Sequence, residues 1–147
     1  MLPSLLLAAT AGARSMTPLA AVSVTAARGD LSPQPGILGL LANKWVVAGT
    51  LALAAGELGG DKMKSAPDRI VFAGLAARTL TGAIAAAALE PKRKRLAAVL
   101  GAGVAIATSF PTFRARMHAM RSHGQTTTGL VEDALVVAAA GAIVRSA

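Results

Sequence analysis

The sequence predicts an all-α fold, a polytopic transmembrane helix bundle of about five helices in a single domain over residues 1–147. Hydrophobic residues make up 54% of the chain, and its mean hydropathy is +0.57. Only 15% of the residues are charged, against roughly 25% in soluble domains. Five apolar segments alternate with stretches rich in proline, glycine or charge. Aromatic residues make up 3%, so a water-soluble core would be weak, whereas membrane helices pack well through alanine and glycine.

The first two apolar segments fill the amino-terminal third of the chain. Residues 3–27 exceed the roughly 20 residues that cross a bilayer, and we expect Pro18 to kink this helix. A loop rich in proline and glycine follows, because residues 28–39 read RGDLSPQPGILG. Residues 41–58 form the second segment, which reaches the required length only marginally.

Three further segments complete the predicted bundle. Residues 70–89 are long enough to span a bilayer, and so are residues 127–144. Residues 96–110 are short and are expected to stop at Pro111, so this helix would be tilted or partly re-entrant. Residues 113–124 are then either an amphipathic helix on the membrane surface or the polar end of the fourth segment.

The positive charge of the chain lies mainly between the apolar segments. The formal net charge is +8, but no aromatic stacking platform accompanies it, so we expect no nucleic acid partner. Anionic lipid headgroups are the expected partners, above all at Lys92, Arg93, Lys94 and Arg95. With five crossings, six Lys and Arg lie on the side of the N-terminus and seven on the other. This near balance gives no orientation by the positive-inside rule.

Two apolar stretches carry an arginine in similar surroundings. Arg14 lies in GARSMTPLAA and Arg78 in AARTLTGAIA, an offset of 64 residues (78 − 14). The likeness indicates a possible duplication of a two-helix unit, over residues of about 3–60 and 67–111, followed by a final helix. Repeats of this kind are common in transporters, whose sites lie near the repeat interface.

Ionisable residues at membrane depth form the candidate site. A charged side chain at the bilayer centre costs about 2.5–3.5 kcal/mol, so these residues are expected to face the bundle interior and to pair. Arginine suits such pairing because its planar fork can bind a carboxylate in two places. Either the pairs only fix the packing of the helices, or they surround a polar site for an anion or for protons. The candidate residues are Arg14, Thr17, Glu57, Asp61, Lys62, Arg78, Thr81, Glu132 and Asp133.

Several of these stretches resemble the bacterial integral membrane family called domain of unknown function 4126. The resemblance covers nearly the whole chain and implies an integral membrane protein, but it implies no activity. The chain departs from the family pattern at Thr79, where a proline is usual, and lacks an Asn-Pro before Glu132, so the last helix is expected to begin differently. The residues that match are Gly12, Arg14, Pro18, Leu19, Glu57, Asp61, Lys62, Arg78, Gly82, Thr127, Thr128, Gly129, Glu132 and Asp133.

These features favour a small transporter or permeation protein for a polar or anionic solute or for protons. The alternative is a membrane scaffold or accessory subunit of a larger complex, with purely structural charges, and a lipid-directed enzyme has the least support. We expect no catalytic residue, cofactor or metal. We expect a multi-pass protein of the bacterial inner membrane, associated with lipids and as a homo-oligomer or in a larger complex.

Overall fold

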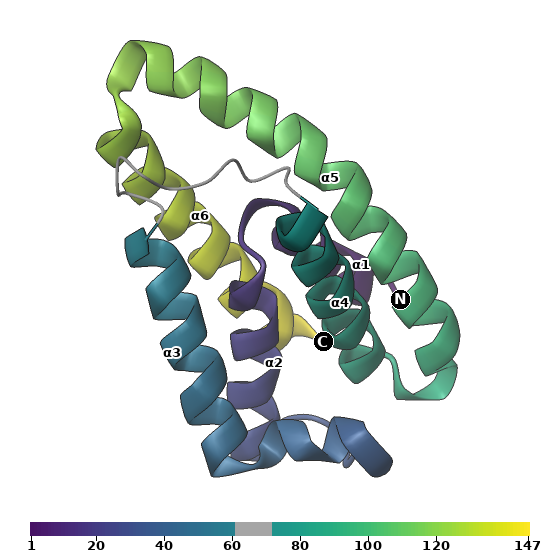
Figure 1. Cartoon of the computed structure of the whole chain (residues 1–147). Coiled ribbons are helices and arrows are strands. Elements are labelled where there is room, and N and C mark those ends of the chain that lie inside the picture. The colour runs from purple at the N-terminus through teal and green to yellow at the C-terminus, as the bar shows by residue number, and fades with distance from the viewer. Residues whose placement is uncertain (61–71) are drawn as a thin grey trace.

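The computed structural model describes residues 1–60 and 72–147, and these residues form helices joined by short connections (Figure 1). This confirms the predicted all-α helix bundle. Two predicted site residues, Asp61 and Lys62, lie outside the described residues. The elements in chain order are α1 (Leu2–Ala13), α2 (Met16–Arg28), the 3₁₀ helix η1 (Gly36–Ala42), α3 (Lys44–Gly60), α4 (Phe72–Leu89), the 3₁₀ helix η2 (Pro91–Arg93), α5 (Lys94–His123) and α6 (Gln125–Ser146).

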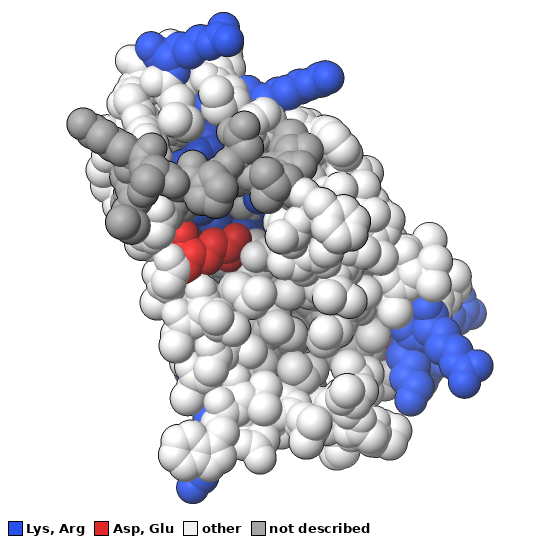
Figure 2. All heavy atoms as spheres, in the orientation of Figure 1, with Lys and Arg blue, Asp and Glu red and all other residues white. Residues whose placement is uncertain are grey.

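Three helices of the described chain are long and apolar enough to cross a membrane, namely α4, α5 and α6. Helix η1 and α3 together make a fourth, bent by 75°. The protein is therefore a multi-pass membrane protein, and the described residues provide three or four helices able to span, so the predicted count of about five is met only loosely. In Figure 2 the visible face is mostly uncharged, with basic atoms at its edges and others beside one small acidic patch.

The first apolar segment is a helical hairpin, not one span, so the prediction for residues 3–27 is wrong. Its outer ends meet the same end of α4. The amino group of Met1 pairs with the Glu90 carboxylate at 2.5 Å, and the Gln34 amide donates to the Ala88 carbonyl at 3.5 Å. The hydrogen bond from the Met1 ammonium is the main reason why the pKa of the Glu90 carboxyl lies below its ordinary value.

The hairpin changes the topology, because the chain enters and leaves at one side of the bundle. The amino terminus therefore lies on the side of Lys92–Arg95, opposite to the assignment that five crossings imply. Pro18 explains the misreading. It is the third residue of α2, where its missing N–H is one that a helix start leaves unbonded in any case, so it marks a beginning and not a kink.

Helix α5 runs without interruption through Pro111, so the predicted stop there is wrong. Residues 113–124 are accordingly the polar end of the fourth segment, as the alternative interpretation held. Proline removes one backbone hydrogen bond, and membrane helices tolerate this where hydroxyl side chains bond nearby carbonyls. Here the Ser109 hydroxyl donates to the Ala105 carbonyl at 2.7 Å, and the Thr112 hydroxyl lies within hydrogen-bonding distance of the Thr108 carbonyl, at 2.7 Å.

Helices α1, α4 and α5 pack closely through small residues. A Cβ atom added at Gly101 of α5 would lie 2.6 Å from the Ala86 Cβ and 2.7 Å from the Gly82 carbonyl oxygen of α4. Both distances are shorter than real side-chain contacts, so only glycine permits this approach. The buried hydrophobic residues of the described chain are mainly alanines, and the close backbones replace the bulky core of a soluble protein.

The two arginine stretches have different backbones. Arg14 is the extended residue that ends α1, whereas Arg78 lies inside the continuous helix α4. The first stretch continues into a hairpin and then a bent pair, while the second continues into the single long helix α5. In the described residues, the sequence likeness around the arginines is therefore not matched by a structural repeat.

Candidate functional site

The tip of the α1–α2 hairpin carries Arg14 into the middle of the bundle. Its side chain is 1% exposed and forms an ion pair with the Asp133 carboxylate of α6. Nη2 of Arg14 also lies 3.7 Å from Oε2 of Glu132. The expected pairing of buried arginines with carboxylates of other helices is thus present at Arg14, and both acids of α6 take part in it.

Glu132 links a second arginine to this cluster. Arg116 of α5 donates from Nη1 to Oε2 of Glu132 at 2.5 Å, and both side chains are largely buried. The sequence interpretation missed Arg116, because it ended the fourth helix at Pro111. The signal was the helical spacing, since Arg116 follows buried Gly101, Ala105 and Ser109 on one face if the helix continues.

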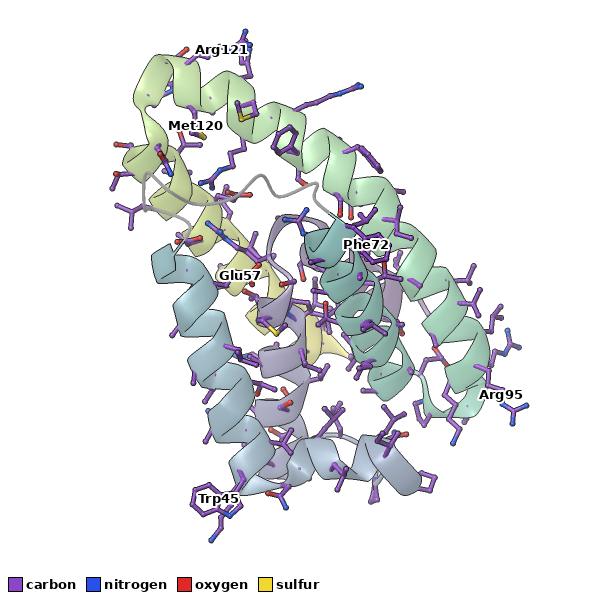
Figure 3. All side chains as sticks on the ribbon, viewed as in Figure 1. Trp45, Glu57, Phe72, Arg95, Met120 and Arg121 are labelled. Atoms are coloured by element: carbon purple, nitrogen blue, oxygen red, sulfur yellow. The ribbon has the colours of Figure 1, made fainter. Side chains whose placement is uncertain are left out.

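Glu57 binds a helix start. From α3 its Oε1 accepts hydrogen bonds from the Ser15 N–H at 2.8 Å and the Ser15 hydroxyl at 3.0 Å. Its Oε2 accepts from the Met16 N–H at 2.8 Å. Figure 3 shows Glu57 near the end of α3, facing the bundle. The carboxylate satisfies N–H groups at the start of α2 and lies at the positive end of its dipole, a role that the sequence interpretation did not foresee.

Both helix ends at the hairpin tip find protein partners. The Thr112 hydroxyl of α5 lies 3.0 Å from the carbonyl of Gly12, in the last turn of α1, and the Thr108 hydroxyl lies 3.1 Å from the Ala9 carbonyl. Each hydroxyl has one proton, which it can donate either across to α1 or within α5. Irregular backbone is tolerated at membrane depth only where protein or a water-filled cavity surrounds it, and here the tip is enclosed by α3, α5 and α6.

Three further predicted site residues lie in α4 and α2. Arg78 is buried within α4, and the Thr81 hydroxyl donates to the Arg78 carbonyl of the same helix at 3.3 Å. Thr17, one turn beyond Arg14, is 6% exposed, and its Oγ1 has no hydrogen-bond partner among the described residues.

Two cavities approach the Arg14 cluster from opposite ends of α6. The α5–α6 cavity, of about 520 Å³, is lined by Ala13, Arg116 and Glu132 at its inner end and by His123 and Thr127 near the start of α6. Its remaining lining residues are mostly apolar.

The second cavity lies between α2, α3 and α6 and has a volume of about 690 Å³. It runs from Thr17 at its inner end to Arg28 and Arg145 at the end of α6. Arg14 and Asp133 line neither cavity, although Ala13 lines the first and Thr17 the second. The two cavities therefore end at the residues that flank Arg14 in the chain, one on each side.

Comparison with known proteins identifies the family. No curated protein and no solved structure matches the chain. A family model described as Domain of unknown function (DUF4126) matches residues 1–145. Since this match covers almost the entire chain, the protein belongs to that family.

Proposed function

We propose that the protein is a transporter or permeation protein of the bacterial inner membrane that moves a polar or anionic solute across it. The observation that carries this proposal is the pair of cavities that end at Ala13 and at Thr17, the residues near the buried Arg14 of the Arg14–Asp133 pair. One cavity reaches Glu132 of the cluster and the other reaches Thr17, and they open toward opposite ends of α6, a helix of 22 residues and therefore about 33 Å long. A solute would then need to pass only one charged layer.

The discontinuous backbone at the tip supports the same function. Transporters commonly form their sites from broken helices whose ends point at the solute. In this chain the α1–α2 break lies beside Arg14, and the start of α2 already binds a carboxylate, that of Glu57. Arginine and a helix start together favour an anion as the solute.

A scaffold or accessory role remains the alternative, and the pairing of the charges supports it. Arg14 is paired with Asp133 and Arg116 with Glu132, and buried pairs often serve packing alone. In such a protein the cavities would be packing defects that lipid tails fill, and no solute would pass.

Flux through reconstituted vesicles tests the proposal. Purified protein in liposomes should move radiolabelled acetate or phosphate faster than empty liposomes do, while a trapped pH dye reports protons. Gly141→Leu should abolish the flux, because Gly141 lines the α2–α3–α6 cavity and its added side chain has open space to fill. The matched control is Ala142→Leu, one residue along on an exposed position.

Flux that Ala142→Leu preserves and Gly141→Leu removes would support passage through this cavity. If folded wild-type protein moves none of these ions, the transport proposal is wrong; if both variants conduct as wild type does, the path through the α2–α3–α6 cavity is wrong. In the first case the scaffold alternative gains support.

A further inference from the structure

The α2–α3–α6 cavity ends inward at Thr17, the residue next to a carboxylate-binding helix start that does not itself line the cavity. The Glu57 side chain is a short aliphatic chain that ends in a carboxylate, and this carboxylate is held by the N–H groups of Ser15 and Met16 and by the Ser15 hydroxyl. A helix start binds anions in this way because its N–H groups are unbonded and its dipole end is positive. The group that binds here is therefore a carboxylate on an apolar stem.

Thr17 adds an unused donor at the same place. It is the second residue of α2, its side chain is more than nine-tenths buried, and it lines the cavity. Its Oγ1 has no hydrogen-bond partner in the described part of the chain. A buried hydroxyl without a partner is unfavourable, so a ligand oxygen that accepts from it would bind more tightly.

The body of the cavity fits an apolar tail. Ala20, Ala21 and Val24 of α2 face Leu51 and Ala55 of α3 across it. The cavity extends along α2 from Thr17 to the charged rim at Arg28, a distance of 11 helical residues (28 − 17) or about 16 Å. The residues that line the cavity between Thr17 and this rim are mostly apolar, so the cavity suits a ligand with a plain aliphatic tail.

We propose that this cavity binds an aliphatic monocarboxylate, with its carboxylate at the start of α2 and its tail along Ala21 and Val24. The ligand carboxylate takes the place of the Glu57 carboxylate and accepts a hydrogen bond from Thr17. The inference rests on the proposed function, since the site adjoins the inner end of one of its two cavities at Thr17, and it names the class of solute.

Helix α3 permits this exchange. It packs mainly against α2 and η1, and the Glu57 side chain is only half-buried. Release of Glu57 from Ser15 and Met16 therefore requires movement of one side chain or of the end of one helix, while the α1–α4–α5 packing stays unchanged.

Equilibrium binding of radiolabelled octanoate to the protein in nanodiscs, with empty nanodiscs subtracted, tests the proposal. Thr17→Val keeps the shape and removes one donor, so it should weaken binding by about two- to tenfold. Thr25→Val is the matched control, because Thr25 lines the same cavity but donates to the Ala21 carbonyl at 2.8 Å. It should change binding less than Thr17→Val does. Glu57→Gln removes the charge of the competing group and should tighten binding.

The proposal is overturned if octanol binds as well as octanoate, or if Thr17→Val and Thr25→Val have equal effects. An effect of Arg145→Gln without an effect of Thr17→Val would also overturn it, because the carboxylate would then lie at the rim. The Thr17 and Thr25 pair keeps the test decisive even if Glu57→Gln does not fold. Octanoate binding without any flux would support this inference and refute transport. Flux of other anions without octanoate binding would support transport and refute this inference.

Discussion

The close contact between α4 and α5 makes a quantitative prediction at Gly101. An alanine there would put its Cβ 2.6 Å from the Ala86 Cβ and 2.7 Å from the carbonyl oxygen of Gly82. Carbon atoms normally approach to about 3.5–4.0 Å, so α4 and α5 must separate by about 1 Å. This separation would loosen the packing that holds α1, and with it the position of the hairpin tip.

Gly103→Ala provides the reference for the magnitude. Gly103 lies on the same helix two residues away, is exposed, and has nothing within 4 Å of an added Cβ. Both substitutions gain about 0.8–1 kcal/mol of helix propensity, which cancels when the two variants are compared. The overpacking that remains costs about 1–3 kcal/mol. Gly101→Ala should therefore be less stable than Gly103→Ala by that amount.

Reversible unfolding in mixed micelles measures the difference. Helicity, followed by circular dichroism as the fraction of sodium dodecyl sulfate rises, gives a free energy of unfolding for each variant. The expected order is Gly101→Ala below wild type and Gly103→Ala at or above it. Equal free energies of unfolding for the two variants would show that α4 and α5 are not in close contact at this point.

Two further predictions concern topology and pairing. The chain has no cysteine, so single introduced cysteines can be labelled specifically. An impermeant maleimide should label Leu2→Cys and Ser32→Cys from one side of intact vesicles, because the hairpin returns to its side of entry. The same reagent should label Ser122→Cys from the other side. If Leu2→Cys were labelled from the same side as Ser122→Cys, the hairpin would be wrong and the first apolar segment would be a single span. Arg116→Gln and Glu132→Gln should each lower the free energy of unfolding by about 3 kcal/mol or more, and the double variant by less than their sum. Additive losses would mean that the two residues are not coupled.

Much of the fold could be predicted from composition and segment length. The third and fifth apolar segments coincide with α4 and α6 to within a few residues, because continuous apolar runs have one stable form in lipid. The errors fall where a local signal has two meanings. Pro18 lies at the start of a helix, whereas Pro111 lies within one. The contacts of the neighbouring residues distinguish the two cases. Glu57 binds the helix start near Pro18, and threonine and serine hydroxyls bond carbonyls near Pro111.

The candidate site could be predicted in part for a similar reason. The cost of burying a charge pointed to Arg14 and to the acids of the last helix, and these residues do pair. The partner of Glu57 could not be predicted, because it is the backbone of a helix start that no sequence pattern had marked. Arg116 escaped notice since its face depends on α5 remaining helical past Pro111.

The ion pair at the hairpin tip constrains how the protein is made. Arg14 leaves the ribosome 119 residues (133 − 14) before the acid that neutralises it. During synthesis the first two helices therefore carry an uncompensated charge that bare lipid disfavours. The hairpin must wait at the insertion machinery or in the headgroup region until the final helix arrives. A nascent chain that stops before α6 would lack this partner, and the cell's membrane proteases would then have an exposed, unfinished bundle to degrade.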